Sequence, residues 1–109
     1  MTEKTVAAYV KKADGNIIRI ELLDNSIRAS LESLGFSDAG GGQLELLTAD
    51  DIAKAAIFDR LRTIGVAFSA GKEWCPAEVF EFLRDQGLLS GFYTRIAWSA
   101  PAQYRLSLE

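Results

Sequence analysis

Hydrophobic and polar residues alternate through the first quarter of the chain. The alternation runs over residues 5–12 and resumes over residues 16–23, with Ile18, Ile20 and Leu22 on one side. A period of two is typical of β-strands. The Asp14-Gly15 pair between the two runs tolerates the backbone angles of a tight hairpin turn. The pattern therefore predicts an antiparallel β-hairpin.

A short helix is predicted next, followed by a glycine-rich segment. Residues 24–26 (Asp-Asn-Ser) can cap a helix whose apolar residues Ile27, Leu31 and Leu34 recur at helical spacing, and Gly35 suits its C-terminal position. Residues 36–42 contain three consecutive glycines. They lack the Gly-Lys-Ser/Thr ending and the G-x-G-x-x-G pattern of phosphate-binding loops. We therefore expect a flexible connector here.

The middle of the chain predicts a strand over residues 43–47 and a long helix that ends at Gly65. Thr48 and Asp51 have the spacing of a capping-box variant at its start. The apolar residues of this helix fall within one arc at 100° per residue, and we expect that face in the core: Ala53, Ile57, Leu61 and Ile64, widened by Ile52 and Ala56. Phe58 projects away from this arc, so it meets a second layer or reaches the surface.

A brief strand over residues 66–69 leads to a turn at Gly71 and to a helix that starts at Cys75-Pro76 and ends at Gly87. One side of this helix is apolar and the other is acidic. The apolar side carries Val79, Phe80, Phe82 and Leu83, and the acidic side carries Glu78, Glu81 and Asp85. Alternation over residues 92–98 and 103–108 predicts a second hairpin.

These elements predict one α+β domain over residues 1–109. We expect a small mixed or antiparallel sheet, made of two hairpins and a central strand, packed against two to three helices in the order ββαβα(β)αββ. The 109 residues are 49% hydrophobic and 25% charged, which is typical of a folding chain with one core.

Composition narrows the possible functions. No apolar run reaches the roughly 20 residues that a membrane span needs, and the N-terminus has no apolar leader, so we expect no membrane partner. With one cysteine and no histidine, no disulfide can form within the chain and no cofactor or metal site is expected. A reducing, cytoplasmic location fits best. The net charge of -3 disfavours nucleic acid as a partner.

From about Ala49 onward, the order helix, strand, helix, hairpin resembles the winged-helix family. The resemblance is clearest in residues 83–89 (LRDQGLL) followed by Tyr104-Arg105-Leu106. It implies that residues 76–86 form a recognition helix and that Arg95 and Arg105 carry DNA binding on the hairpin. The acidic side of that helix opposes contact with phosphates, so a nucleic-acid binder is our third hypothesis.

Catalysis has one candidate residue. Cys75 precedes a helix, whose dipole can stabilise a thiolate. No histidine is present to act as its base, and Trp74 and Pro76 beside it favour an inert, packed cysteine. Asp50-Asp51 is explained by the helix dipole, and the acidic residues of the later helix by a solvated face. From the sequence it is uncertain whether the protein is an enzyme, and the residues favour a noncatalytic protein.

Aromatic residues are the remaining signal, because tyrosine and tryptophan are enriched in interfaces. Our candidate interaction surface consists of Phe58, Trp74, Tyr93, Trp98 and Tyr104 together with Glu78, Glu81 and Asp85. A cross-strand pair of Trp98 with Tyr104 would explain both of them by sheet stability alone. No site is placed on the final Leu108-Glu109.

The leading hypothesis is a noncatalytic protein-interaction module that self-associates as a homodimer or binds another protein. Its basis is that the hairpin strand 92–98 carries few charges, which invites pairing across a two-fold axis. The alternative is a small-molecule-binding domain with an aromatic pocket between helices and sheet. That pocket would be lined by Phe68, Trp74, Phe80 and Phe92.

Overall fold

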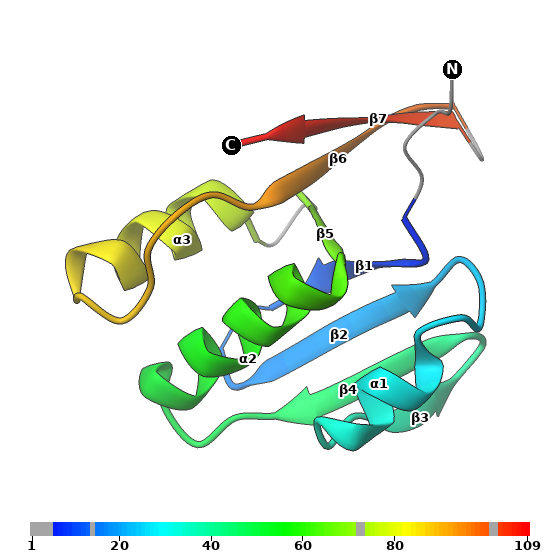
Figure 1. The fold of residues 1–109 in the computed structure, drawn as a ribbon, viewed down its shortest axis with the longest axis horizontal. Helices are drawn as coiled ribbons and strands as arrows, with labels where there is room; N and C mark the ends of the chain where they lie inside the picture. Colours follow the sequence, from blue (N-terminus) through cyan, green and yellow to red (C-terminus); the bar gives the residue numbers. More distant parts are fainter. Residues whose placement is uncertain (1–5, 14, 72–73, 101–102) are drawn as a thin grey trace.

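The computed structural model describes residues 6–13, 15–71, 74–100 and 103–109. In these parts of the chain, three helices pack against a seven-stranded mixed sheet, which confirms the expected α+β class (Figure 1). The elements are β1 (Ala8–Lys12), β2 (Ile17–Leu22), α1 (Arg28–Ser33), β3 (Ser37–Gly40), β4 (Gln43–Leu47), α2 (Asp51–Ile64), β5 (Ala67–Ser69), α3 (Pro76–Asp85), β6 (Thr94–Ala100) and β7 (Gln103–Leu108).

The sheet has the strand order β3-β4-β2-β1-β5-β6-β7. Strands β3, β4, β2 and β1 are antiparallel to their neighbours in this series, and β6 is antiparallel to β7. Strand β5 lies between β1 and β6 and runs parallel to both. All three residues of β5 are buried, as expected of a parallel strand inside a sheet. The brief strand predicted over residues 66–69 is therefore the element that joins the two antiparallel halves.

The glycine-rich segment is a hairpin, so the expectation of a plain connector over residues 36–42 was wrong. β3 pairs with β4, and the chain reverses through Gly40, Gly41 and Gly42 with φ angles of 88°, 61° and 77°. Three successive positive φ angles are accessible at little cost only to glycine. The Gly40 backbone N–H also donates a 2.9 Å hydrogen bond to Asp38 Oδ1, which stabilises the turn.

The caps of the first two helices differ from those predicted. At α1, Asp24 Oδ1 accepts a 2.8 Å hydrogen bond from the Ser26 N–H and does not cap the helix, which begins after Ile27. At α2, the cap is Asp50, whose Oδ1 accepts a 2.8 Å hydrogen bond from the Ala53 N–H. Thr48 is instead buried, and its hydroxyl donates to the Asn16 carbonyl at 3.2 Å.

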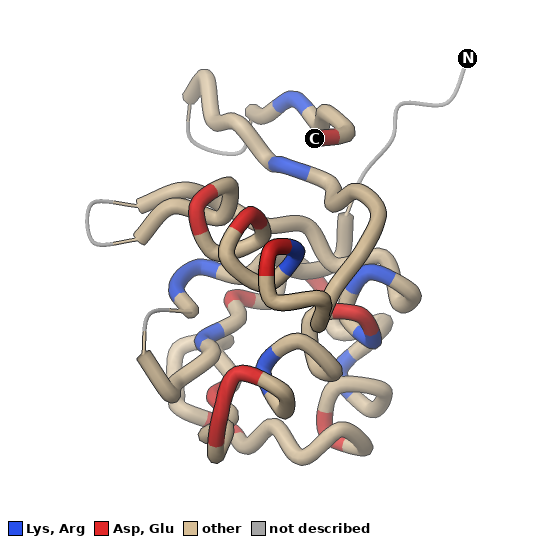
Figure 2. The backbone as a smooth tube through the Cα atoms, turned by 90° about the vertical axis from the view of Figure 1, so that its left-hand side faces the viewer, with Lys and Arg blue, Asp and Glu red and all other residues tan. Residues whose placement is uncertain are grey.

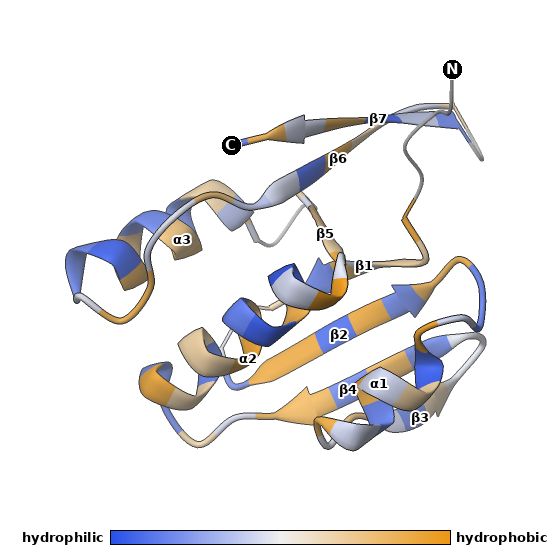
Figure 3. Ribbon diagram, in the orientation of Figure 1, coloured by the Kyte–Doolittle hydropathy of each residue, from blue (hydrophilic) through white to orange (hydrophobic). Residues whose placement is uncertain are grey.

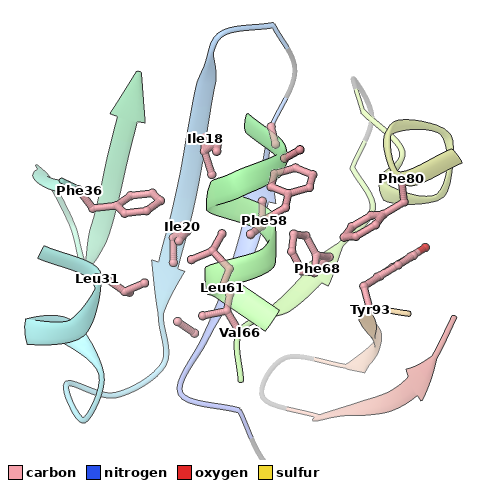
Figure 4. Packing of buried hydrophobic residues seen from close by; sticks show 14 of the residues in the cluster. Ile18, Ile20, Leu31, Phe36, Phe58, Leu61, Val66, Phe68, Phe80 and Tyr93 are labelled. Atoms are coloured by element: carbon pink, nitrogen blue, oxygen red, sulfur yellow. The ribbon is translucent and has the colours of Figure 1, made fainter. Parts of the chain in front are cut away.

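The buried face of α2 is rotated from the predicted one. It comprises Lys54, Ala55, Phe58 and Leu61, whereas the side chain of Ile52 is 65% exposed. Phe58 is fully buried, with its ring centroid 5.1 Å from that of Phe68 and 5.3 Å from that of Phe80 (Figure 4). Burying one large aromatic ring among others removes more apolar area from water than burying Ile52 would, and this decides the orientation of the helix.

Helix α3 begins with Pro76 at its first position and packs through Phe80 and Leu83. The Phe80 ring stacks on Tyr93 with the centroids 4.2 Å apart. Phe82 was expected on the same side but is 48% exposed. The reason is geometric, because two helical residues point about 200° apart when they are separated by two positions.

The two faces of the sheet are covered differently. Side chains alternate along the strands, as the banded colouring of β2 and β4 in Figure 3 shows. One face forms the main core with all three helices, through residues such as Leu31, Phe58 and Leu83. The other carries a smaller buried cluster of Tyr9, Ala67 and Ile96, packed against Val6, Tyr104 and Leu106. None of these six residues belongs to a helix. We call this the helix-free face.

The Cα radius of gyration is 13.2 Å, which is the value expected of one compact domain of about 100 residues. Among the described residues, no helix combines the length and the apolar character that crossing a membrane requires.

Candidate functional site

Three aromatic rings form a row on the helix-free face. The ring centroid of Trp98 lies 5.3 Å from that of Tyr9 and 5.2 Å from that of Tyr104, both in edge-to-face geometry. Trp98 and Tyr104 are direct partners across β6 and β7, which confirms the cross-strand pair considered from the sequence. The Trp98 side chain is nevertheless 40% exposed, so part of this row remains accessible.

Hydrogen bonds fix the two tyrosines of the row. The Tyr104 hydroxyl accepts a 3.2 Å hydrogen bond from the Val6 N–H, and the Tyr9 hydroxyl donates to the carboxylate of Glu21. Burial raises the pKa of Tyr9 well above the ordinary value of a tyrosine, and the hydrogen bond and the charge of Glu21 raise this pKa further. Tyr9 is therefore a neutral donor that links β1 to β2.

Among the described residues, no strand pairs with the outer edge of β7, which lies beside this row. Tyr93 and Glu109 exchange two backbone hydrogen bonds, of 2.9 and 3.3 Å. In an antiparallel ladder such pairs alternate with pairs that point their N–H and C=O groups away. The inward groups of β7 therefore belong to Arg105 and Ser107, while those of Tyr104, Leu106 and Leu108 point outward from the sheet.

The order of the strands corrects one detail of the dimer hypothesis. Strand β6 pairs with β5 at Arg95 and Ile96 and with β7 along its whole length, so it is not an edge strand. The two edges of the sheet are β3 and β7. β3 has only four residues, including Asp38, whereas β7 has six and carries a single charge, Arg105. Short edges and charges discourage strand pairing, so β7 is the more available edge.

A hollow of about 370 Å³ opens at the ends of β1 and β5. Three cationic residues line it, Lys11, Lys12 and Arg19, and none of the eight lining residues that the structure describes is acidic. Trp74 and Tyr9 supply aromatic walls. The Trp74 indole Nε1 donates a 2.8 Å hydrogen bond to the Lys11 carbonyl, which holds the ring in place.

Arg19 is held at the hollow by an ion pair. Its Nη2 lies 3.2 Å from Glu45 Oε1 on β4, while its side chain remains 39% exposed. The Nε atom of the same guanidinium is buried and has no hydrogen-bond partner among the described residues. A guanidinium carries five N–H donors, so Arg19 retains donors beyond the one directed at Glu45.

The acidic side of α3 is on the surface as expected. Glu78, Glu81 and Asp85 are exposed, and Figure 2 shows acidic positions on successive turns of the helix nearest the viewer. In the described part of the chain, no group of three or more His, Cys, Asp or Glu residues has the geometry to hold a metal ion.

Three members of the predicted interaction surface lie in the interior. Phe58, Trp74 and Tyr93 are 0%, 7% and 2% exposed, so they stabilise the core and do not form an outer surface. Burial raises the pKa of Tyr93, and the nearby charge of Glu109 raises it further. Trp98, Tyr104 and the acidic residues of α3 remain as the accessible part of the predicted surface.

The aromatic pocket predicted between helices and sheet is filled. Phe68 and Phe80 are both fully buried, with their ring centroids 5.0 Å apart, and Figure 4 shows them directed toward one another. Phe92 is 66% exposed and lies outside this cluster. Of the four predicted lining residues, Trp74 borders a hollow, and that hollow lies at the ends of β1 and β5.

The remaining candidates are a thiol and a recognition helix. Cys75 is half-buried at the extended residue before α3 and makes no side-chain capping bond. The elements α2, β5, α3, β6 and β7 follow in the order helix, strand, helix, hairpin, on which the resemblance to the winged-helix family rests. However, the described residues between β5 and α3 contain no helix, and the three strands belong to a seven-stranded sheet.

Comparison with known proteins adds no relative: no protein-family model matches the chain, and neither a curated protein nor a solved structure shows significant similarity to it.

Proposed function

We propose that the protein is a protein-interaction module that self-associates by pairing β7 with β7 of a second copy. The observation that carries this proposal is the row of outward backbone groups at Tyr104, Leu106 and Leu108. Unpaired N–H and C=O groups on an edge strand can continue the hydrogen-bond ladder with another strand. A two-fold axis makes the two strands antiparallel and uses the same patch twice.

One register satisfies the symmetry best. If Leu106 faces Leu106 of the second copy, each Tyr104 faces Leu108 of the other strand, and all the outward groups find partners. Arg105 then faces Ser107 of the other copy. A different register, in which Arg105 faces Arg105 of the second copy, would place two like charges opposite each other, which is unfavourable.

The side chains add an apolar contribution in this register. Tyr104, Leu106 and Leu108 project onto the helix-free face, where Leu108 is 70% exposed. Pairing would bring Leu108 against Tyr104 of the second copy and cover part of its apolar surface. Two short strands bury less area than a standard stable interface, so the dimer should be weak and should depend on concentration.

The test is the solution mass of the wild-type chain and two leucine variants, measured by sedimentation over about a hundredfold range of concentration. Leu108→Lys places a charge on the proposed interface. Leu47→Lys is the matched control, because Leu47 is an exposed leucine (74%) on β4, away from β7. We expect the wild type and Leu47→Lys to dimerise alike, and Leu108→Lys to dissociate at least about tenfold more readily.

Amide hydrogen exchange locates the contact without a mutation. Raising the protein concentration should slow exchange at the outward N–H groups of Tyr104 and Leu106. The inward N–H groups of Arg105 and Ser107 should exchange at a rate that does not change with concentration. A strictly monomeric wild type, or a dimer unaffected by Leu108→Lys, would overturn the proposal.

A further inference from the structure

We infer that the hollow at the ends of β1 and β5 is a binding site for a small anion that carries an aromatic ring. This inference is independent of β7 pairing, because no residue of β7 lines the hollow. It concerns the residues Tyr9, Lys11, Lys12, Arg19, Ser69 and Trp74.

Charge is the first reason. The whole chain has a net charge of -3, yet the described residues that line the hollow include three cations and no carboxylate. Two carboxylates contact lining residues without lining the hollow themselves, since Glu45 pairs with Arg19 and Glu21 accepts from Tyr9. A concave surface lined by one sign of charge focuses the field and attracts a ligand of the opposite sign.

The available hydrogen-bond donors are the second reason. The Trp74 indole N–H is already directed to the Lys11 carbonyl, and the Tyr9 hydroxyl to Glu21. The aromatic walls therefore offer mainly ring surface. Charged donors remain on Lys11, which is exposed, and on the guanidinium of Arg19, whose side chain is 39% exposed and whose ion pair with Glu45 engages Nη2. Guanidinium groups match the geometry of carboxylates and phosphates.

Shape is the third reason. A volume of about 370 Å³ falls at the lower end of the range for small-molecule sites, which are mostly apolar with a few placed polar groups. A flat ring can pack against Trp74 and Tyr9 while its anionic group reaches Arg19 and Lys11. The ligand class is thus a ring-bearing phosphate or carboxylate of modest size.

The experiment is a titration with phenyl phosphate, followed by calorimetry and by the NMR signal of the Trp74 indole N–H. Phenol and inorganic phosphate are separate probes that carry only the ring or only the anion. We expect phenyl phosphate to bind at least about tenfold more tightly than either and to shift the Trp74 signal more than that of Trp98.

Variants assign the binding to the hollow. Arg19→Gln and Lys11→Gln should each weaken phenyl phosphate binding by about tenfold. Both residues have exposed or half-exposed side chains, so the fold should survive, which the NMR spectrum checks. Arg60→Gln is the matched control, because Arg60 is exposed on α2 and does not line the hollow.

Three outcomes would overturn the inference. The first is no binding of phenyl phosphate up to about 10 mM, well above the affinities of specific ligands. The second is binding as tight by phenol or by inorganic phosphate, which would show that ring and charge are not recognised together. The third is binding of phenyl phosphate that Arg19→Gln and Lys11→Gln leave unchanged.

Discussion

The Lys54 ammonium donates a 2.7 Å hydrogen bond to the carbonyl oxygen of Ala13, which joins the first half of α2 to the chain just after β1. Lys54 is only 7% exposed and Ala13 is fully buried. A buried charged group is tolerated only when hydrogen bonds or opposite charges compensate for its lost hydration. The contact explains how a lysine can belong to the core-facing side of α2.

Removing this contact should weaken the fold. Lys54→Ala takes away the donor and leaves the Ala13 carbonyl buried without it, so we expect a loss of about 1–3 kcal/mol in the free energy of unfolding. Urea denaturation followed by far-UV circular dichroism measures this loss. Arg60→Ala on the exposed side of α2 is the control and should change stability by less than about 0.5 kcal/mol. Equal effects of the two variants would contradict the structural role of Lys54.

A second pair of variants tests the orientation of α2. Phe58→Ala should cost about 3–5 kcal/mol of stability, because it removes a fully buried ring that contacts Phe68 and Phe80. Ile52→Ala should cost less than about 1 kcal/mol, since Ile52 is 65% exposed. Should Phe58→Ala fail to fold, Phe58→Leu gives a smaller loss that can be measured. A larger loss of stability in Ile52→Ala than in Phe58→Ala would instead support the orientation predicted from the helical wheel.

The sequence pattern predicts the elements better than it predicts their faces. Period-two alternation locates most of the strands, and helical spacing and terminal glycines locate the helices, because these signals are local. The buried face of α2 depends on which rings meet there, and Phe68 and Phe80 come from elements that follow it in the chain. Strand β3 escaped prediction because its four residues, SDAG, contain no large apolar side chain.

The candidate site could be predicted only where its residues are close in sequence. Trp98 and Tyr104 flank one turn, so their pairing follows from the hairpin. The hollow could not be predicted, because Trp74 comes 63 positions after Lys11 and β5 reaches β1 by a parallel pairing that the hairpin pattern does not show. Which strand forms the free edge likewise depends on the strand order of the whole sheet.

The glycine turn between β3 and β4 provides a third test. Gly41 has a φ of 61°, and a Cβ added there would meet no atom within 4 Å. Gly41→Ala should therefore lower stability by about 1–2 kcal/mol through backbone strain alone. Gly71→Ala is the control, because Gly71 lies outside the left-handed region and its added Cβ would make ordinary contact with Trp74 at 3.5 Å. A Gly41→Ala protein as stable as the wild type would show that the turn does not need its left-handed geometry.

High pH should destabilise the fold through Tyr9. Burial, followed by the hydrogen bond and charge of Glu21, raises the pKa of this phenol in the folded chain above the ordinary value of 10.0. The folded state therefore keeps a proton that the unfolded chain loses above about pH 10. The stabilisation is fully present below that pH and decreases as the pH rises further, toward the folded-state pKa.

Denaturant unfolding at several pH values between about 8 and 11 measures this effect. Tyr9→Phe loses the hydrogen bond to Glu21, so it should be less stable than the wild type at about pH 8. It also lacks the ionisable hydroxyl, so its free energy of unfolding should fall less between about pH 9.5 and 11. The pKa of Tyr93 is raised in the same direction, and Tyr93→Phe should likewise reduce the alkaline loss. If both variants lose as much stability as the wild type over this interval, another group controls the alkaline transition.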